Sequence, residues 1–220
     1  MSANKVIITS AIATEFGSGN RMSETLRTIE SVRKAIDAEI YLLDGSIQDF
    51  NKKPLDDAVD VFIRVYDNHT LNIVETGYGM PFVKSATEVY LMQIALDLIG
   101  SNAKRVYKIS GRYKLNDQFV EHEGQNFTFL KPKKTGIAYD KCDTDGMLMT
   151  RLYSLPGEFR TYFMGVLNHV QKYLWKTYGS NGLTDIEHGF YKYIPHYLCD
   201  FVDTIGVEGR IGHLVTEVRE

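Results

Sequence analysis

Residues 104–117, KRVYKISGRYKLND, are the stretch on which the interpretation of the whole chain depends. Positions 106–109 form a mainly apolar run typical of a buried β-strand, and Ser110 and Gly111 end it. Ligands of open α/β sheets bind beyond the carboxyl ends of the strands, so cations placed there favour an anionic ligand. The alternative is a strand and a turn with solvated charges. Five residues of the stretch are basic: Lys104, Arg105, Lys108, Arg112 and Lys114.

The first 45 residues show a strand, helix and strand pattern. Residues 6–8 and 40–43 are aliphatic or β-branched runs typical of buried strands. Ser23 is placed to cap a helix between them, and Glu30 and Lys34 form an i,i+4 pair on its outer face. This order predicts a parallel βαβ unit with a right-handed crossover. The apolar residues of the helix recur at helical spacing: Leu26, Ile29, Val32 and Ile36.

The same alternation continues up to residue 112. Residues 60–65 are typical of a third strand, and residues 85–98 of a helix that is apolar around most of its circumference and ends at Gly100. The order strand–helix–strand, strand, helix–strand predicts an α/β fold with a central, mostly parallel sheet flanked by helices.

Beyond residue 117 the pattern changes. Pro156 precedes one expected helix, Thr184 is placed to cap another, and a strand pair is expected around Ile205 and Val215. No linker or repeat interrupts the chain, so we expect one domain, 1–220, in two halves. Besides that strand pair, the second half is expected to contain strands at 126–130 and 146–153 and helices at 158–178 and 185–193.

Composition and charge narrow the class of protein. The 220 residues are 44% hydrophobic and 24% charged, as in soluble globular proteins, and a net charge of −3 excludes a protein that coats polyanions generally. Cys142 and Cys199 fit neither a disulfide framework nor metal-ligand spacing. The first residues lack the apolar run of a signal peptide, and no run is long enough for a membrane span. We therefore expect a cytoplasmic protein, with peripheral membrane association left open.

Two common nucleotide-binding motifs are absent from the sequence. The segment GSGN at 17–20 lacks the third glycine of GxGxxG, and no GxxxxGK[ST] segment occurs. A dehydrogenase or a P-loop enzyme is therefore not expected. Tyrosine is the commonest aromatic residue, and its ring suits sugars and nucleobases as well as a core.

Four segments resemble a known family: RMSETLRTIESVRK, IYLLDGS, KSATEVYLMQIAL and VYKISGRYKL. Their order resembles that of small GT-A glycosyltransferase-like proteins of bacterial surface-polysaccharide loci and phages. The later segment IEHGFYKYI resembles the part that often carries an acidic residue near the acceptor. The resemblance spans most of residues 5–195.

The resemblance implies a single Rossmann-like GT-A domain, with a nucleotide-binding half at 1–117 and an acceptor-side half at 118–220. It implies transfer of a sugar from a nucleotide-diphosphate donor to a carbohydrate or lipid-linked acceptor in polysaccharide biosynthesis. A non-catalytic nucleotide- or sugar-binding module that keeps the fold is the alternative, because fold does not fix function.

The chain departs from this family at the metal site. GT-A enzymes place a DxD pair after the strand that reads VYKIS here, to hold Mg²⁺ or Mn²⁺ on the sugar diphosphate, but this chain has Ser110-Gly111-Arg112. Arginine can neutralise a diphosphate through planar bidentate hydrogen bonds. The departure implies a metal-independent site, or a metal held elsewhere. Asp143 and Asp145 form a DxD in a turn-like segment before a strand, so they are weak metal candidates beside a solvated turn.

The residues that match the family segments supply a candidate donor site. Arg112 and Lys114 are expected at the diphosphate with Ser110 as a hydroxyl donor, and Asp44 near the base or ribose. Surface ion pairs and strand-ending turns are the alternatives for these residues. The full set of expected donor-binding residues is Arg21, Asp44, Ser46, Lys84, Ser110, Arg112 and Lys114.

Glu187 and His188 form the candidate acid–base pair, and Asp185 is a substitute for either. Inverting sugar transfer needs a base that deprotonates the acceptor hydroxyl, although a retaining mechanism stays open. The alternative for the pair is a solvated helix surface.

A nucleic-acid partner is not expected. Residues 104–134 are basic, but the net charge is negative and acidic residues interrupt the segment at Asp117, Glu121 and Glu123.

Overall fold

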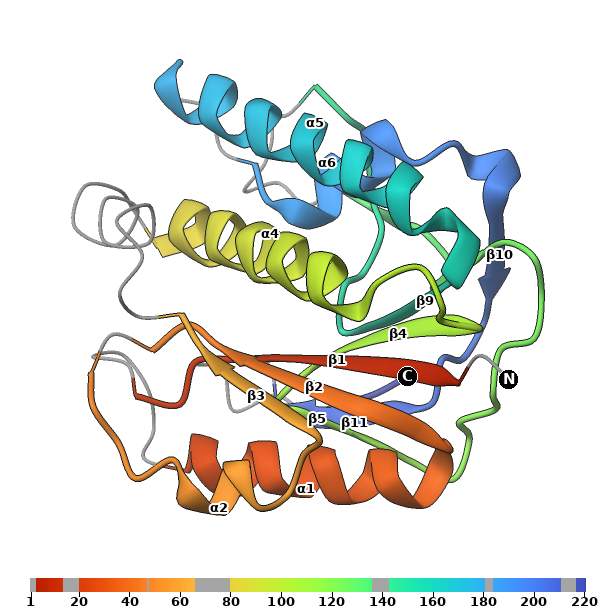
Figure 1. Ribbon diagram of the computed structural model, residues 1–220. Coiled ribbons are helices and arrows are strands. Elements are labelled where there is room, and N and C mark those ends of the chain that lie inside the picture. The colour runs from red at the N-terminus through yellow and green to blue at the C-terminus, as the bar shows by residue number, and fades with distance from the viewer. Residues whose placement is uncertain are drawn as a thin grey trace.

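The computed structural model describes residues 3–13, 20–46, 48–65, 80–135, 143–180, 184–210 and 217–220 (Figure 1). A seven-stranded sheet lies at its centre, in the order β10-β6-β9-β4-β1-β2-β3. Neighbouring strands are parallel except at β9, which is antiparallel to β4 and β6. The predicted α/β class with a mostly parallel sheet is confirmed. The strands are β1 (Asn4–Ser10), β2 (Ala38–Asp44), β3 (Val61–Arg64), β4 (Arg105–Ser110), β6 (Phe127–Leu130), β9 (Leu152–Pro156) and β10 (Cys199–Val202).

Helices cover both faces of this sheet. In Figure 1, α1 and α2 lie below the sheet, and α4, α5 and α6 lie above it. No described helix combines the length with the apolar character that a bilayer crossing requires. The helices are α1 (Arg21–Ala35), α2 (Lys53–Asp56), α4 (Met80–Ile99), α5 (Arg160–Gly179) and α6 (Ile186–Tyr193), with short 3₁₀ helices at Gly157–Phe159 and His196–Leu198.

Each face of the sheet has its own apolar core. Successive side chains of a strand point to opposite faces, so Val6 and Ile8 of β1 pack on the α1 side and Ile7 packs on the α4 side. The α1 residues Ile29 and Val32 join the first core, as their helical spacing predicts. Burial of both faces explains why β1, β2 and β4 are nearly continuous apolar runs.

Two smaller sheets flank the central one. The three-stranded sheet β12-β11-β5 is antiparallel and consists of β5 (Tyr113–Leu115), β11 (Val207–Arg210) and β12 (Glu217–Arg219). The other sheet pairs β7 (Lys133–Lys134) with β8 (Gly146–Met147). β5 follows β4 after two residues and contacts α1, so the connection at 111–112 joins the two larger sheets.

Several predicted boundaries are wrong. α1 begins at Arg21 after Asn20, so Ser23 lies inside the first turn and does not cap it. Asp185, not Thr184, caps α6, because its carboxylate accepts the backbone N–H of His188. The long helix starts at Arg160, since Pro156 ends β9 and a 3₁₀ turn follows.

The single strand predicted at 146–153 is also wrong. Residues 148–151 belong to no strand, and the Leu148 N–H bonds the Glu187 carbonyl of α6. The late strand pair is present as β11 and β12, although Val215 itself lies outside the described residues. The polar segments at 14–19 and 66–79 also lie outside them.

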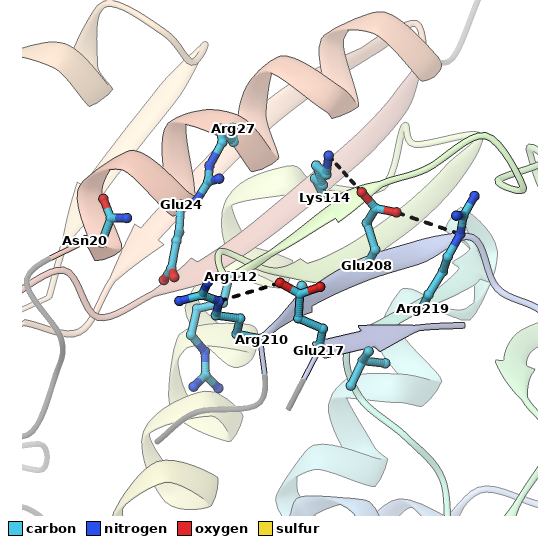
Figure 2. Close-up of a pocket in the computed structure, with 11 residues that line it drawn as sticks. Asn20, Glu24, Arg27, Arg112, Lys114, Glu208, Arg210, Glu217 and Arg219 are labelled. Atoms are coloured by element: carbon cyan, nitrogen blue, oxygen red, sulfur yellow. Dashed lines mark ion pairs between the residues drawn. The ribbon is translucent and has the colours of Figure 1, made fainter. Parts of the chain in front are cut away.

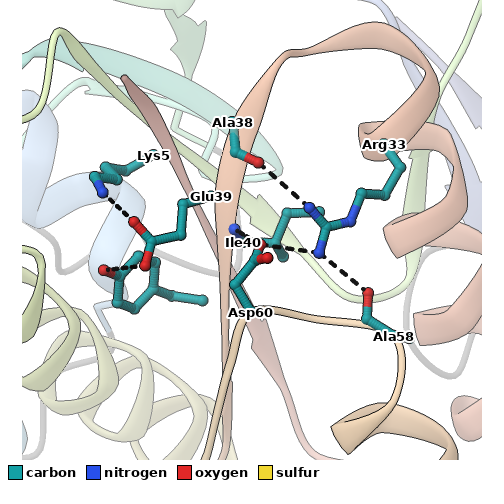
Figure 3. A network of polar contacts seen from close by, with 8 residues as sticks. Lys5, Arg33, Ala38, Glu39, Ile40, Ala58 and Asp60 are labelled. Carbon is teal, nitrogen blue, oxygen red and sulfur yellow. Dashed lines mark hydrogen bonds and ion pairs between the residues drawn. The ribbon is translucent and has the colours of Figure 1, made fainter. Parts of the chain in front are cut away.

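At the amino ends of β1 and β2, charged side chains pair with one another (Figure 3). Lys5 pairs with Glu39, which also accepts a hydrogen bond from the Tyr41 hydroxyl at 3.0 Å. Asp60 accepts the Ile40 N–H at 2.7 Å and pairs with Arg33 at 2.9 Å. These groups hold the strands and their turns together at this edge, where their charges are locally balanced.

Candidate functional site

The carboxyl ends of three neighbouring parallel strands bring the candidate donor site together. Ser10 of β1 lies in register with Asp44 of β2, and Thr9 lies in register with Ser110 of β4. The chain runs from β1 to β2 on one side and later returns to place β4 on the other. Such a reversal of strand order is where open α/β sheets bind their ligands.

Asp44 organises the connection that leaves β1. Its buried carboxylate accepts hydrogen bonds from the Ser10 hydroxyl at 2.7 Å and from the N–H groups of Ile12 and Ser46, both at 2.9 Å. The Ser46 hydroxyl in turn accepts the Ala13 N–H at 2.8 Å. A carboxylate has roughly four lone-pair sites, so Asp44 keeps about one for a ligand. In this structure Asp44 and Ser46 shape residues 10–13.

Three cations from separate elements converge next to this connection. Arg21 begins α1, Lys84 lies in the first turns of α4, and Arg112 follows β4. Burial and then Arg112 lower the pKa of Arg21, although Glu24 and Asp44 oppose this effect. Partial burial, Arg112 and Arg21 lower the pKa of Lys84, in that order. The three side chains are therefore close enough to repel one another.

The partners of these cations differ. Arg21 donates a hydrogen bond to the Ala11 carbonyl at 3.0 Å, which ties it to the β1–α1 connection. Within the described part of the chain, the side chain of neither Arg112 nor Lys84 has a hydrogen bond or an ion pair. Cations that repel one another are stabilised by a bound anion. We call Arg21, Lys84 and Arg112 the cation triad.

Gly111 fixes the backbone that carries Arg112. Its N–H donates to the Thr9 carbonyl at 2.8 Å, and its carbonyl accepts the Thr25 hydroxyl at 3.1 Å. A Cβ at this position would lie 2.9 Å from Thr25 Oγ1 and 3.2 Å from Ser10 Cβ. Only glycine lets the chain pass this close to α1 and β1, so the direction in which Arg112 leaves the sheet is set by packing.

Arg112 also lines a groove of about 460 Å³ between α1 and the β12-β11-β5 sheet (Figure 2). Lys114 lies in this groove on β5 and pairs with Glu208 at 2.8 Å, apart from the cation triad. Arg27 of α1 lines it as well, and no ion pair to Arg27 occurs among the described residues. The lining residues are Asn20, Glu24, Arg27, Arg112, Lys114, Glu208, Gly209, Arg210, Glu217, Val218 and Arg219.

The candidate acid–base residues lie at the start of α6. The Thr150 hydroxyl donates to Glu187 Oε1 at 2.7 Å. Burial, with smaller contributions from Asp185 and Glu88, raises the pKa of Glu187 to about 8. His188 is fully buried, and its Nδ1 lies 2.5 Å from Asp185 Oδ1. The pair is therefore not the solvated helix surface weighed as its alternative.

Sequence reasoning did not connect Lys108, Glu88 and Thr150 with this pair. Lys108 of β4 has no exposed side-chain surface, and its ammonium group forms an ion pair with Glu88 of α4. It also donates to Ser110 Oγ at 3.0 Å and to the Thr150 carbonyl at 2.7 Å. The sequence signal that could have identified this ion pair was Lys108 inside an apolar strand pattern and Glu88 inside an apolar helix.

Arg105, at the opposite end of β4, forms hydrogen bonds that join neighbouring segments of the fold. Its buried guanidinium donates to Ser154 Oγ at 2.7 Å and to the carbonyls of Gly124 and Asn126 at 2.5 and 2.8 Å. Burial and then Arg105 lower the pKa of His122 to about 4, so this histidine is neutral beside it. Arg105 and Arg112 therefore lie at opposite ends of β4.

The residues present do not fit a divalent metal at the family's usual position. Ser110-Gly111-Arg112 offers no carboxylate, and the cations Arg21 and Lys84 lie close to Arg112. Asp143 pairs with Lys192 and accepts the Tyr173 hydroxyl at 2.5 Å, while Asp145 is exposed. Over the described ranges, no three His, Cys, Asp or Glu side chains are grouped to hold a metal ion. Metal binding by Asp143 and Asp145 stays a prediction.

Comparison with solved structures identifies the fold. The crystal structure of the galactosyltransferase LgtC in complex with donor and acceptor sugar analogues matches 90% of this chain and 72% of that chain, with a TM-score of 0.59. The two chains share a glycosyltransferase-type fold. Their sequences are 9% identical, so the likeness shows the fold alone. No protein-family model and no curated protein matches the sequence.

Proposed function

We propose that this protein is a glycosyltransferase that moves a sugar from a nucleotide-diphosphate donor to a carbohydrate or lipid-linked acceptor. The cation triad at the carboxyl ends of β1 and β4 is the observation that carries this proposal. The triad lies where this fold class binds its ligands, and it is built to hold an anion. We place the reaction in polysaccharide biosynthesis, as the sequence resemblance implies, and in the cytoplasm, as the sequence composition and the amino-terminal residues predict.

The triad supplies the electrostatic part of the reaction. Negative charge builds on the departing nucleoside diphosphate as the sugar leaves, and preorganised cations stabilise that charge in the transition state. Arg112 and Arg21 can form bidentate hydrogen bonds to phosphate oxygens, and Lys84 adds a point charge. Ser110 contributes a hydroxyl at the strand end. A metal-independent donor site follows from this charge distribution.

Glu187 supplies the base. A pKa of about 8 lies close to ordinary working pH, where a general base combines an adequate ionised fraction with high basicity. The ionised carboxylate would take the acceptor hydroxyl proton during an inverting displacement. His188, held by Asp185, fixes the first turn of α6 next to it.

A non-catalytic binding module is the second candidate. The observation that favours it is the Ser-Gly-Arg segment, which stands where GT-A enzymes carry the metal-binding DxD carboxylates. Such a module would bind the nucleotide sugar in the same way and would form no nucleoside diphosphate in the presence of acceptors.

A thermal-shift screen of UDP-, GDP-, dTDP- and CMP-linked sugars in EDTA and in Mn²⁺ tests the donor site, since a ligand of the folded state raises the melting temperature. We expect one diphosphate sugar to stabilise the protein in EDTA. Arg112→Ala should weaken its binding by about 10- to 150-fold, because a charge-assisted hydrogen bond contributes ~1.5–3 kcal/mol.

Arg27→Ala is the matched control, because Arg27 lines the same groove without belonging to the triad. Equal losses in both variants would move the anion site into the groove. Stabilisation that needs Mn²⁺ would contradict the metal-independent site, and no response to any nucleotide would contradict the glycosyltransferase proposal.

A further inference from the structure

Lys108 is a charged residue in the middle of an apolar strand. Side chains alternate along β4, so its neighbours Tyr107 and Ile109 face the α1 core while Lys108 points to the α4 side. There its three ammonium protons have three acceptors: the Glu88 carboxylate, Ser110 Oγ and the Thr150 carbonyl. A buried ammonium is tolerated only with such complete pairing.

Thr150 links this ion pair to the candidate base. Its carbonyl accepts from Lys108, and its hydroxyl donates to Glu187 Oε1 at 2.7 Å. The chain of contacts therefore runs from Glu88 of α4 through Lys108 of β4 and Thr150 to Glu187 of α6. One branch, through Ser110, reaches the end of β4 beside Arg112.

The charged and titratable groups around Glu187 come from each element that packs against it. Asp185 and His188 share its helix, Glu88 faces it from α4, and Tyr153 of β9 is fully buried near both glutamates. Lys108 is the cation bonded to this acidic group. Its charge offsets that of Glu88, so the charge felt by Glu187 depends on whether the ion pair is intact.

We propose that Lys108 and Glu88 are positioning residues that set the protonation and the orientation of Glu187 from inside the sheet. Glu88 repels the charge of an ionised Glu187, and Lys108 cancels part of that repulsion. Thr150, held by Lys108, directs one oxygen of Glu187 and leaves the other for the acceptor. The catalytic meaning of this arrangement rests on the proposed function, but the arrangement itself is measurable without substrate.

The proposal predicts opposite shifts in the titration midpoint of Glu187 for substitutions at the two residues. Simple loosening of the fold would not produce shifts of opposite sign. Glu88→Gln removes the repelling charge, so the titration midpoint of Glu187 should fall by about 1 pH unit. Lys108→Met removes the cation that offsets the charge of Glu88, so the midpoint should rise by about 1 pH unit. The carboxyl signals are followed by carbon-13 NMR of labelled glutamate, and Glu187→Gln assigns the signal. Glu39→Gln, which breaks the ion pair with Lys5 at the opposite edge, is the control and should leave the midpoint unchanged.

Unchanged midpoints in both variants, or shifts in the same direction, would overturn the proposal. If Lys108→Met does not fold, Glu88→Gln alone decides, because it leaves Lys108 with an amide oxygen to bond. These titrations use the free protein, so they can succeed even where no nucleotide sugar binds. If sugar transfer is observed, the acidic limb of the kcat–pH profile should move with the midpoint in each variant.

Discussion

Glu187 keeps its proton at neutral pH because burial and its acidic neighbours raise its pKa to about 8. In an unfolded chain the same side chain ionises near 4.5. Between these two values the folded protein binds one proton that the unfolded chain has lost. Stability contributed by this group is therefore complete below about pH 4.5 and is lost as the pH rises towards 8. The residue proposed as the base thus lowers stability at the pH where it works.

We expect Glu187→Gln to weaken the pH dependence of unfolding. The free energy of unfolding of the unaltered protein should fall from pH 5 to pH 8 by about 3–4 kcal/mol more than that of the variant, since each pKa unit corresponds to about 1.4 kcal/mol. Glutamine keeps the acceptor for Thr150, so the fold is preserved. Urea titrations at both pH values measure the difference. Glu123→Gln, at an exposed position, is a control for the loss of one carboxyl group. The prediction is contradicted if the unfolding free energy of Glu187→Gln changes with pH as much as that of the unaltered protein.

At the scale of elements, the connection from β1 to α1 depends on β2. Asp44 at the end of β2 accepts three hydrogen bonds that fix residues 10–13, and Arg21 of α1 donates to the Ala11 carbonyl in the same connection. Arg21 of the cation triad is therefore positioned by the sheet through hydrogen bonds. Arg21 would lose its defined place if this connection loosened.

Asp44→Ala should destabilise the protein by about 2–4 kcal/mol, because buried donors left without an acceptor cost about 1–3 kcal/mol each and the connection can partly relax. Amide hydrogen exchange at Ile12 and Ser46 should accelerate more than exchange at the centre of β1. Urea unfolding and exchange NMR measure the two effects. Nucleotide-sugar affinity lost without either effect would instead identify Asp44 as a direct ligand contact.

At the scale of the molecule, the two halves of the chain share their sheets and cores. β9 from the second half pairs with β4 from the first, and β11 pairs with β5. The α4-side core combines Val106 with Phe163 and Phe190. Neither half can bury these apolar surfaces alone, so we expect 1–220 to behave as one cooperative unit.

The single tryptophan, Trp175 in α5, allows this cooperativity to be measured. Its fluorescence reports the second half, while far-UV circular dichroism reports the helices and strands of the whole chain. We expect both signals to change at the same urea concentration with one transition. Two separated transitions would show that 1–117 and 118–220 unfold independently.

The sequence by itself determined the elements whose patterns are local. Apolar runs and helical spacing located β1, α1, β2, α4 and β4, and their order predicted the parallel sheet and its binding edge. The resemblance to GT-A proteins, together with positions beside strand ends and helix starts, pointed to Arg21, Lys84 and Arg112. Periodicity is a property of a few consecutive residues, so it can be read without the fold.

Only the tertiary structure decided which charges meet. Lys114 pairs with Glu208 across a sheet that joins distant segments, and Lys108 meets Glu88 and Thr150 on two other elements. The short β10 exists because it pairs with β6, more than sixty residues earlier. Ion pairs, burial and pKa depend on neighbours that the chain brings together through space. Spacing along the sequence does not encode them, because their free energy arises from contacts between elements.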